Sequence, residues 1–161
     1  MKGDARFSLR KNATEIIRQR ISELNKKTNV DRGSFDIWHY ETCRMIRKLY
    51  EEAEIKFSWG QAQKWLNMTI KYLYIIGGCP IDDVFPLCHI PVDEYVIRIA
   101  EKELYIPIPK NKWSKWSYFQ YMAYQGALRS RILDRYNLAP LRWEFKSWLK
   151  EVRRLKEGNR L

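Results

Sequence analysis

The stretch Ser58-Trp-Gly-Gln-Ala-Gln-Lys64 separates two long segments with helical spacing, and it decides how this chain is interpreted. Apolar residues recur at helical intervals up to about residue 55 and again from about residue 61 to residue 76. The turn places the small residues Gly60 and Ala62 four and two positions before a lysine. A tight helix–turn–helix of this kind directs backbone N–H groups outward at a helix N-terminus, where a DNA phosphate can dock. A glycine turn between helices is more often only a connector, so other residues must decide its role.

Helical spacing continues along the rest of the chain, and no stretch offers the alternating runs and hairpin turns of a sheet. Local signals mark helix starts: Asn12 with Glu15 forms a capping-box pattern, Ser34 can cap the next helix, and Pro91 suits the first position of a later one. We expect helices at about residues 12–25, 34–55, 61–76, 91–103, 114 or 117–136, and 140–157. The sequence therefore predicts an all-α protein, a compact bundle of about seven helices forming one domain over residues 1–161.

Composition limits the partners and the compartment. Thirty Lys and Arg residues against 19 Asp and Glu give a formal net charge of +11, which favours a polyanionic partner such as nucleic acid. No apolar run approaches the roughly 20 residues that cross a bilayer. The charged N-terminus lacks the apolar core of an export signal. We therefore expect a cytoplasmic protein without a membrane partner.

The cysteines indicate neither a disulfide framework nor a metal centre. There are three, Cys43, Cys79 and Cys88, and no two of them form a CxxC pair. His39 and Cys43 lie four residues apart on an expected helix, but two ligands are too few for a metal site. We interpret this pair as part of a half-buried helix face and expect no metal.

Asp93, in the segment Ile90-Pro-Val-Asp93, is a candidate partner for Lys64. An acid at the start of a helix is stabilised by unpaired N–H groups and the helix dipole, which explains it without any function. However, Lys64 is also near a helix N-terminus, and residues 77–90 are long enough to run back along the roughly 20 Å of the preceding helix. The two N-termini can therefore meet, which would place a lysine and a carboxylate in one cleft.

The segments around Lys64 and Asp93 resemble a known family. Lys64-Trp-Leu-Asn-Met-Thr-Ile-Lys-Tyr-Leu73, followed by Ile90-Pro-Val-Asp-Glu-Tyr-Val-Ile-Arg98, resembles the archaeal 8-oxoguanine DNA glycosylases, a branch of the helix-hairpin-helix superfamily. The resemblance continues into Pro140-Leu141 and Trp148-Leu149 and covers roughly residues 57–155. Its order and spacing are more specific than any one motif.

The resemblance implies a hairpin and catalytic segment at about residues 56–104, with Lys64 as the nucleophile and Asp93 assisting it. In such an enzyme the neutral amine attacks C1′ of a nucleotide flipped out of double-stranded DNA and expels the base. A Schiff base remains, from which strand cleavage by β-elimination can follow. The carboxylate accepts a proton from the amine and stabilises positive charge on the sugar. The scheme requires no metal or cofactor and implies no obligatory protein partner.

The same register implies a base pocket. Lys71, seven residues after the nucleophile, and the stacking Trp148 match the family, whereas Glu144 stands where the family carries aspartate. Met68 replaces a stacking phenylalanine. These changes leave open whether the excised base is an oxidised purine like 8-oxoguanine, as in DNA repair, or a modified base of phage DNA, as in antiviral defence.

Contact with DNA is expected mainly from the turn before the nucleophile. The predicted contact residues are Trp59, Gly60, Gln61 and Ala62, where Ala62 replaces a second glycine common across the superfamily. Trp113 and Trp116, in the lysine-rich connector near residues 110–115, are further candidates for stacking on an exposed base or filling the gap in the duplex.

Two alternatives belong to other classes. A non-catalytic helix-hairpin-helix module would bind DNA and keep its biological activity after Lys64→Gln. A protein-interaction domain would use the aromatic surface, and its DNA affinity would be absent or independent of ionic strength.

Overall fold

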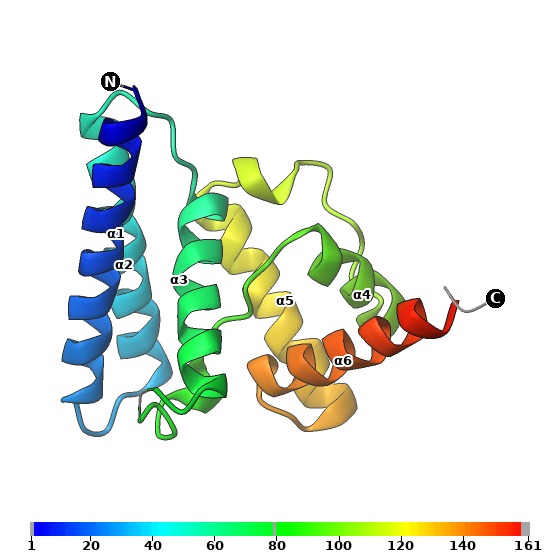
Figure 1. Cartoon of the computed structure of the whole chain (residues 1–161). Helices are drawn as coiled ribbons and strands as arrows, with labels where there is room; N and C mark the ends of the chain where they lie inside the picture. Colours follow the sequence, from blue (N-terminus) through cyan, green and yellow to red (C-terminus); the bar gives the residue numbers. More distant parts are fainter. Residues whose placement is uncertain (1, 79, 159–161) are drawn as a thin grey trace.

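The computed structural model describes residues 2–78 and 80–158 and is shown in Figure 1. These residues form α-helices and short 3₁₀ helices and contain no β-strand, which confirms the all-α class. In chain order the elements are α1 (Lys2–Asn25), α2 (Arg32–Glu52), α3 (Trp59–Ile75), η1 (Phe85–Leu87), α4 (Glu94–Leu104), η2 (Trp113–Lys115), α5 (Tyr118–Tyr136) and α6 (Pro140–Gly158). The expectation of about seven helices was slightly wrong, because the described residues form six α-helices and two three-residue 3₁₀ helices.

The helices pack around two apolar clusters. α1, α2 and α3 bury the first cluster with residues 81–88, and α4, α5 and the start of α6 bury the second. Figure 1 shows α3 between the α1–α2 pair and the group formed by α4, α5 and α6. An extended segment, residues 88–93, leads from the first cluster to the second and ends at the start of α4.

Helix starts follow side-chain caps, although not always the caps that the sequence suggested. Ser58 forms a reciprocal capping box with Gln61, and Ser117 does the same for α5. The predicted start at Asn12 was wrong, because α1 already begins at Lys2. Ser34 was also wrong as a cap: its backbone N–H donates to the Asp31 side chain, which is the cap of α2.

The start of α4 likewise differs from the expected Pro91. The helix begins at Glu94, and the Asp93 side chain caps it by accepting a hydrogen bond from Val96 N at 2.9 Å. Proline fixes a φ that suits extended backbone as well as the first turn of a helix, so Pro91 alone could not decide the boundary.

A buried polar network joins α2, α3, α5 and the extended segment. His39 Nε2 lies 2.8 Å from Asn67 Oδ1, and the Tyr121 hydroxyl lies 2.6 Å from His89 Nδ1. His89 Nε2 in turn lies 2.7 Å from a carboxylate oxygen of Asp36. The helix face of His39, expected to be half-buried, is therefore fully buried, and burial lowers the pKa of its imidazole well below the usual value.

In the described ranges, none of the helices combines the length and the apolar character needed to span a bilayer.

Candidate active site

The structure brings Lys64 and Asp93 together. Lys64 lies in the second turn of α3 and Asp93 at the N-cap of α4, 29 residues further along the chain. The Nζ of Lys64 lies 2.9 Å from Oδ2 of Asp93. The side chains retain 34% and 26% of their exposure, so a ligand can reach both without unfolding any part of the chain.

The two carboxylate oxygens of Asp93 have different partners. Oδ1 accepts the capping hydrogen bond from Val96 N, and Oδ2 accepts the hydrogen bond from Lys64. The cap therefore fixes the rotation of the carboxylate and points Oδ2 at the amine. This geometry suits a carboxylate that takes a proton from the ammonium group and leaves a neutral, nucleophilic amine.

The other side of the amine faces an aromatic ring. Lys64 Nζ lies 4.9 Å from the centroid of the Trp113 ring, so it is held between a carboxylate and an indole face. The sequence placed Trp113 in a lysine-rich connector but gave no reason to set it beside this particular lysine. Only the fold of the connector against α3 reveals the contact.

The connector docks on the first turn of α3. Ser58 Oγ donates a 2.6 Å hydrogen bond to Ser114 O, and the backbone of Trp113 passes so close to Gly60 that a Cβ there would overlap its carbonyl oxygen. Gly60 is thus required for close packing with the connector.

The four predicted DNA-contact residues of this turn differ in accessibility. Trp59 is buried and stacks on Tyr40 at 5.0 Å, and Ala62 is fully buried. Gly60 lies beneath the connector, and only Gln61 is exposed, with its side chain accepting the capping hydrogen bond from Ser58 N. A DNA contact at this turn remains a prediction, and of these four residues only Gln61 is exposed to solvent.

Lys71 and Glu144 form a second, buried ion pair between α3 and α6. Lys71 Nζ lies 2.7 Å from Glu144 Oε1, and the side chains are only 7% and 6% exposed. Burial raises the pKa of Glu144, although the hydrogen bond from Lys71 opposes this shift. The second oxygen of Glu144, Oε2, is buried and has no hydrogen-bond partner in the described part of the molecule. Glu144 therefore keeps one buried oxygen without a hydrogen-bond partner among the described residues.

Aromatic rings surround this pair. Lys71 Nζ lies 5.0 Å from the Phe145 ring centroid and 5.5 Å from that of Trp148. Trp148 is 42% exposed and Met68 is partly buried, so both can contact a bound molecule. All four base-pocket residues implied by the resemblance, Met68, Lys71, Glu144 and Trp148, thus lie on facing parts of α3 and α6 or within one turn of the pair.

Both ion pairs lie along one face of α3. Lys64, Met68 and Lys71 are spaced by four and three residues, which places them on the same side of a helix over about 10 Å. The negative charge of Asp93 also raises the pKa of Glu144, so the two ion pairs interact electrostatically. The buried Tyr95 hydroxyl of α4 has no hydrogen-bond partner among the described residues. Burial raises its pKa, and the negative charges of Asp93 and Glu144 raise it further.

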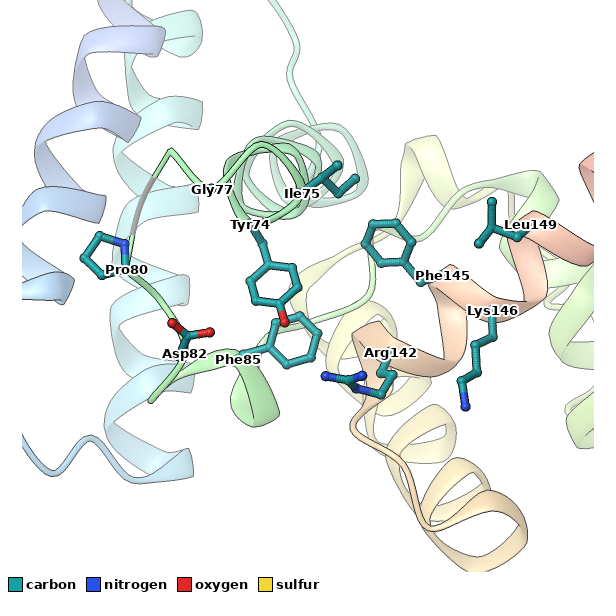
Figure 2. A pocket seen from close by; sticks show the side chains of 10 residues that line it. All are labelled: Tyr74, Ile75, Gly77, Pro80, Asp82, Phe85, Arg142, Phe145, Lys146 and Leu149. Carbon is teal, nitrogen blue, oxygen red and sulfur yellow. The ribbon is translucent and has the colours of Figure 1, made fainter.

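A cavity of about 770 Å³ lies beyond Phe145, between the end of α3, the segment after it and α6 (Figure 2). Tyr74 and Phe85 stack at 4.1 Å on one side, and the Arg142 guanidinium lies 5.7 Å from the Phe85 ring. Lys146 is also among the lining residues, whereas Lys64 and Asp93 are not. No local pattern in the sequence signals this cavity, because its walls come from segments about 60 residues apart.

No metal centre is formed by the described residues: no group of three or more His, Cys, Asp or Glu side chains there is placed to hold an ion. Cys43 and Cys88 are free and buried, and burial raises the pKa of both thiols, to about 12 for Cys88. Cys79 lies outside the described residues.

Comparison with protein-family models, with curated proteins and with solved structures found no match in any of the three. The function must therefore be argued from the site itself.

Proposed function

We propose that this protein is a DNA glycosylase of the helix-hairpin-helix type, in which α2, the turn before α3 and α3 form the motif. Lys64 is the nucleophile and Asp93 its proton acceptor. The observation that carries the proposal is the 2.9 Å contact between Lys64 Nζ and Asp93 Oδ2, two half-exposed groups from distant segments. Both side chains keep part of their exposure, so a substrate can reach the pair.

The reaction begins with proton transfer from the Lys64 ammonium group to Asp93. The neutral amine forms a bond to C1′ of the flipped nucleotide, and the N-glycosidic bond breaks with its electron pair leaving on the base, which takes up a proton. The nitrogen then gives up a proton and the C1′–O4′ bond breaks, O4′ taking up a proton, which leaves a protonated Schiff base between Lys64 and C1′ of the sugar. Loss of a C2′ proton expels the 3′ phosphate by β-elimination, which gives the enzyme a lyase activity.

Charge supports DNA as the partner. The formal net charge is +11, and the connector whose Trp113 contacts Lys64 exposes three lysines close to Trp113 in the sequence: Lys110, Lys112 and Lys115. A duplex with its damaged strand over Lys64 would place phosphates near these lysines. Because the proposed substrate is cellular or invading DNA, we propose that the enzyme acts in the cytoplasm.

The buried pair supports selection of a damaged or modified base. Lys71 donates, the free Oε2 of Glu144 accepts, and Trp148 offers an exposed face for stacking. An oxidised purine of the 8-oxoguanine kind and a modified base of phage DNA are the two substrate classes we propose, which correspond to repair and to antiviral defence. Met68, partly buried in the same region, offers a stacked base a smaller surface than an aromatic side chain would.

The test is to incubate the protein with duplexes that each contain one oxidised, alkylated, deaminated or glucosylated base and then add borohydride, which reduces a Schiff base to a stable covalent adduct. We expect an adduct and free base with one class of duplex. Lys64→Gln should abolish the adduct and retain DNA binding, whereas Lys48→Gln, a change to an exposed lysine of α2, should retain the adduct.

Other outcomes favour other classes. DNA binding that weakens with salt, without base release from any duplex, would indicate a non-catalytic DNA-binding module. No salt-dependent DNA binding would favour a protein-interaction domain. Base release without an adduct would show that water, not Lys64, attacks C1′.

A further inference from the structure

Two fully buried glutamines hold the extended segment that carries Asp93. Gln63 of α3 donates from Nε2 to the carbonyl oxygen of Val92 at 2.9 Å, and its Oε1 accepts from Val92 N at 3.2 Å. Gln125 of α5 holds Ile90 in the same way, with bonds of 2.6 Å to the carbonyl oxygen and 3.3 Å from N. Each side-chain amide thus pairs with both polar groups of one backbone residue, as a neighbouring strand would.

The Gln63 amide is fully satisfied and therefore has one orientation. Nε2 also donates to Gly60 O at 2.9 Å, and Oε1 also accepts from Asn67 Nδ2 at 3.0 Å. With two donors and one twice-accepting oxygen all paired, rotation of the amide would break several bonds in a dry environment. Gln63 therefore behaves as a rigid bracket between α3 and Val92.

Sequence neighbours connect this bracket to the site. Gln63 precedes Lys64, and Val92 precedes Asp93. The two hydrogen bonds between Gln63 and Val92 therefore join the two chain segments one residue before each member of the ion pair. A reacting pair loses much of its rate when its geometry shifts by about 1 Å, so this bracket acts at the distance scale that matters for proton transfer.

We propose that Gln63 is a positioning residue: its bracket on Val92 sets the separation of Lys64 Nζ and Asp93 Oδ2, and the activity of the pair depends on it. The proposal rests on the proposed glycosylase function. Gln125 provides a matched control, because it is equally buried and makes the same two bonds to the same segment, but at Ile90, three residues from Asp93.

The test measures single-turnover base release and DNA affinity for Gln63→Met and Gln125→Met, alone and combined with Asp93→Asn. We expect Gln63→Met to slow base release at least about tenfold at unchanged DNA affinity, and Gln125→Met to slow it less than about threefold. In the Asp93→Asn background Gln63→Met should cause no further loss, because its effect passes through Asp93. Equal losses in the two glutamine variants, or an undiminished loss in the Asp93→Asn background, would overturn the proposal.

If Gln63→Met does not fold, Gln63→Asn replaces it, because this amide is shorter by one methylene group and does not reach Val92. Crystal structures of the variants provide a measurement that needs no activity. The Lys64–Asp93 distance should exceed 3.5 Å in the Gln63 variant and remain near 2.9 Å in Gln125→Met. If the wild type releases no base from any DNA, the glycosylase function fails, while this distance still decides whether Gln63 positions the pair.

Discussion

The carbonyl oxygen of Trp113 occupies the space in which a side chain on Gly60 would begin. This close approach holds the connector against the first turn of α3 and leaves the Trp113 ring 4.9 Å from Lys64 Nζ. The absence of a side chain at Gly60 thus allows Trp113 to lie against Lys64.

The first prediction follows from this contact. Gly60→Ala should push the connector away from α3, lower the free energy of unfolding by about 2 kcal/mol and slow base release, because the added Cβ meets backbone rather than a movable side chain. Gly126→Ala is the control: nothing lies within 4 Å of its Cβ position in α5, so it should raise stability by about 0.5 to 1 kcal/mol. Urea denaturation measures the free energy of unfolding of the two variants. Equal changes in Gly60→Ala and Gly126→Ala would contradict the role of the Trp113 contact.

The second prediction separates base recognition from the reaction at the sugar. Lys71→Met alone would leave Glu144 buried without its partner and cost about 3 to 5 kcal/mol, so the neutral double variant Lys71→Met/Glu144→Gln is preferred. We expect it to release the base about tenfold more slowly, yet to form the borohydride adduct with abasic DNA at the wild-type rate. Asp93→Asn, in contrast, should slow both reactions. If the double variant slowed base release and adduct formation with abasic DNA equally, the buried pair would have no specific role in recognising the base.

The third prediction concerns acid stability. Burial lowers the pKa of His89 to about 4, whereas an unfolded histidine titrates near 6.5. Between these pH values the His89 side chain binds a proton in the unfolded chain but not in the folded protein. Its contribution to the free energy of unfolding is therefore fully present above about pH 6.5 and decreases as the pH falls. At pH 4.5 the loss from His89 alone should be about 2.5 kcal/mol.

His89→Gln, which cannot titrate, tests this origin. Denaturation measures the free energy of unfolding at pH 7 and at pH 4.5. The decrease between these two pH values should be about 2.5 kcal/mol smaller in His89→Gln than in the wild type. Measuring no lower than pH 4.5 keeps the contribution of Asp36 small: burial opposes the lowering of its pKa, but hydrogen bonds from His89 and Arg129 lower it overall, so its stabilisation is lost mainly below the unfolded pKa of about 3.9. An unchanged decrease in the variant would assign the acid sensitivity to other groups.

The fourth prediction places part of the DNA on the α6 side of the molecule. Arg142 and Lys146 are exposed at the cavity of Figure 2, and neither forms an ion pair with a described residue. Arg142→Gln/Lys146→Gln should weaken binding of duplex DNA and reduce the slope of log affinity against log salt by roughly 2, one for each lost phosphate contact.

A matched double variant removes the same charge elsewhere. Arg18 and Lys48 lie on α1 and α2 and pair with Glu15 and Glu52, respectively. Arg18→Gln/Lys48→Gln should leave the salt slope close to that of the wild type. Equal slopes in the two double variants would show that net charge, not a phosphate contact on α6, governs binding.

The sequence determined the helical class and most helix positions, because helical spacing and caps act over three or four residues. Ser58 and Ser117 cap the helices that follow them, and Pro140 begins α6. The same local rules misplaced the start of α1, since the Asn12–Glu15 pattern also fits the exposed face inside a longer helix. Local patterns cannot distinguish these two settings when the flanking residues are also helix formers.

The sequence also identified Lys64 and Asp93 as candidates, but only the tertiary structure decided that they touch. The contact spans 29 residues, and the Lys71–Glu144 contact spans 73. Such pairs depend on how whole helices pack and on buried hydrogen bonds such as those from Gln63 to Val92, which leave no periodic trace in the sequence. The contact of Trp113 with Lys64 and the cavity behind Phe145 were missed for the same reason: each is made by segments that are distant in the sequence and are brought together by the packing of the helices.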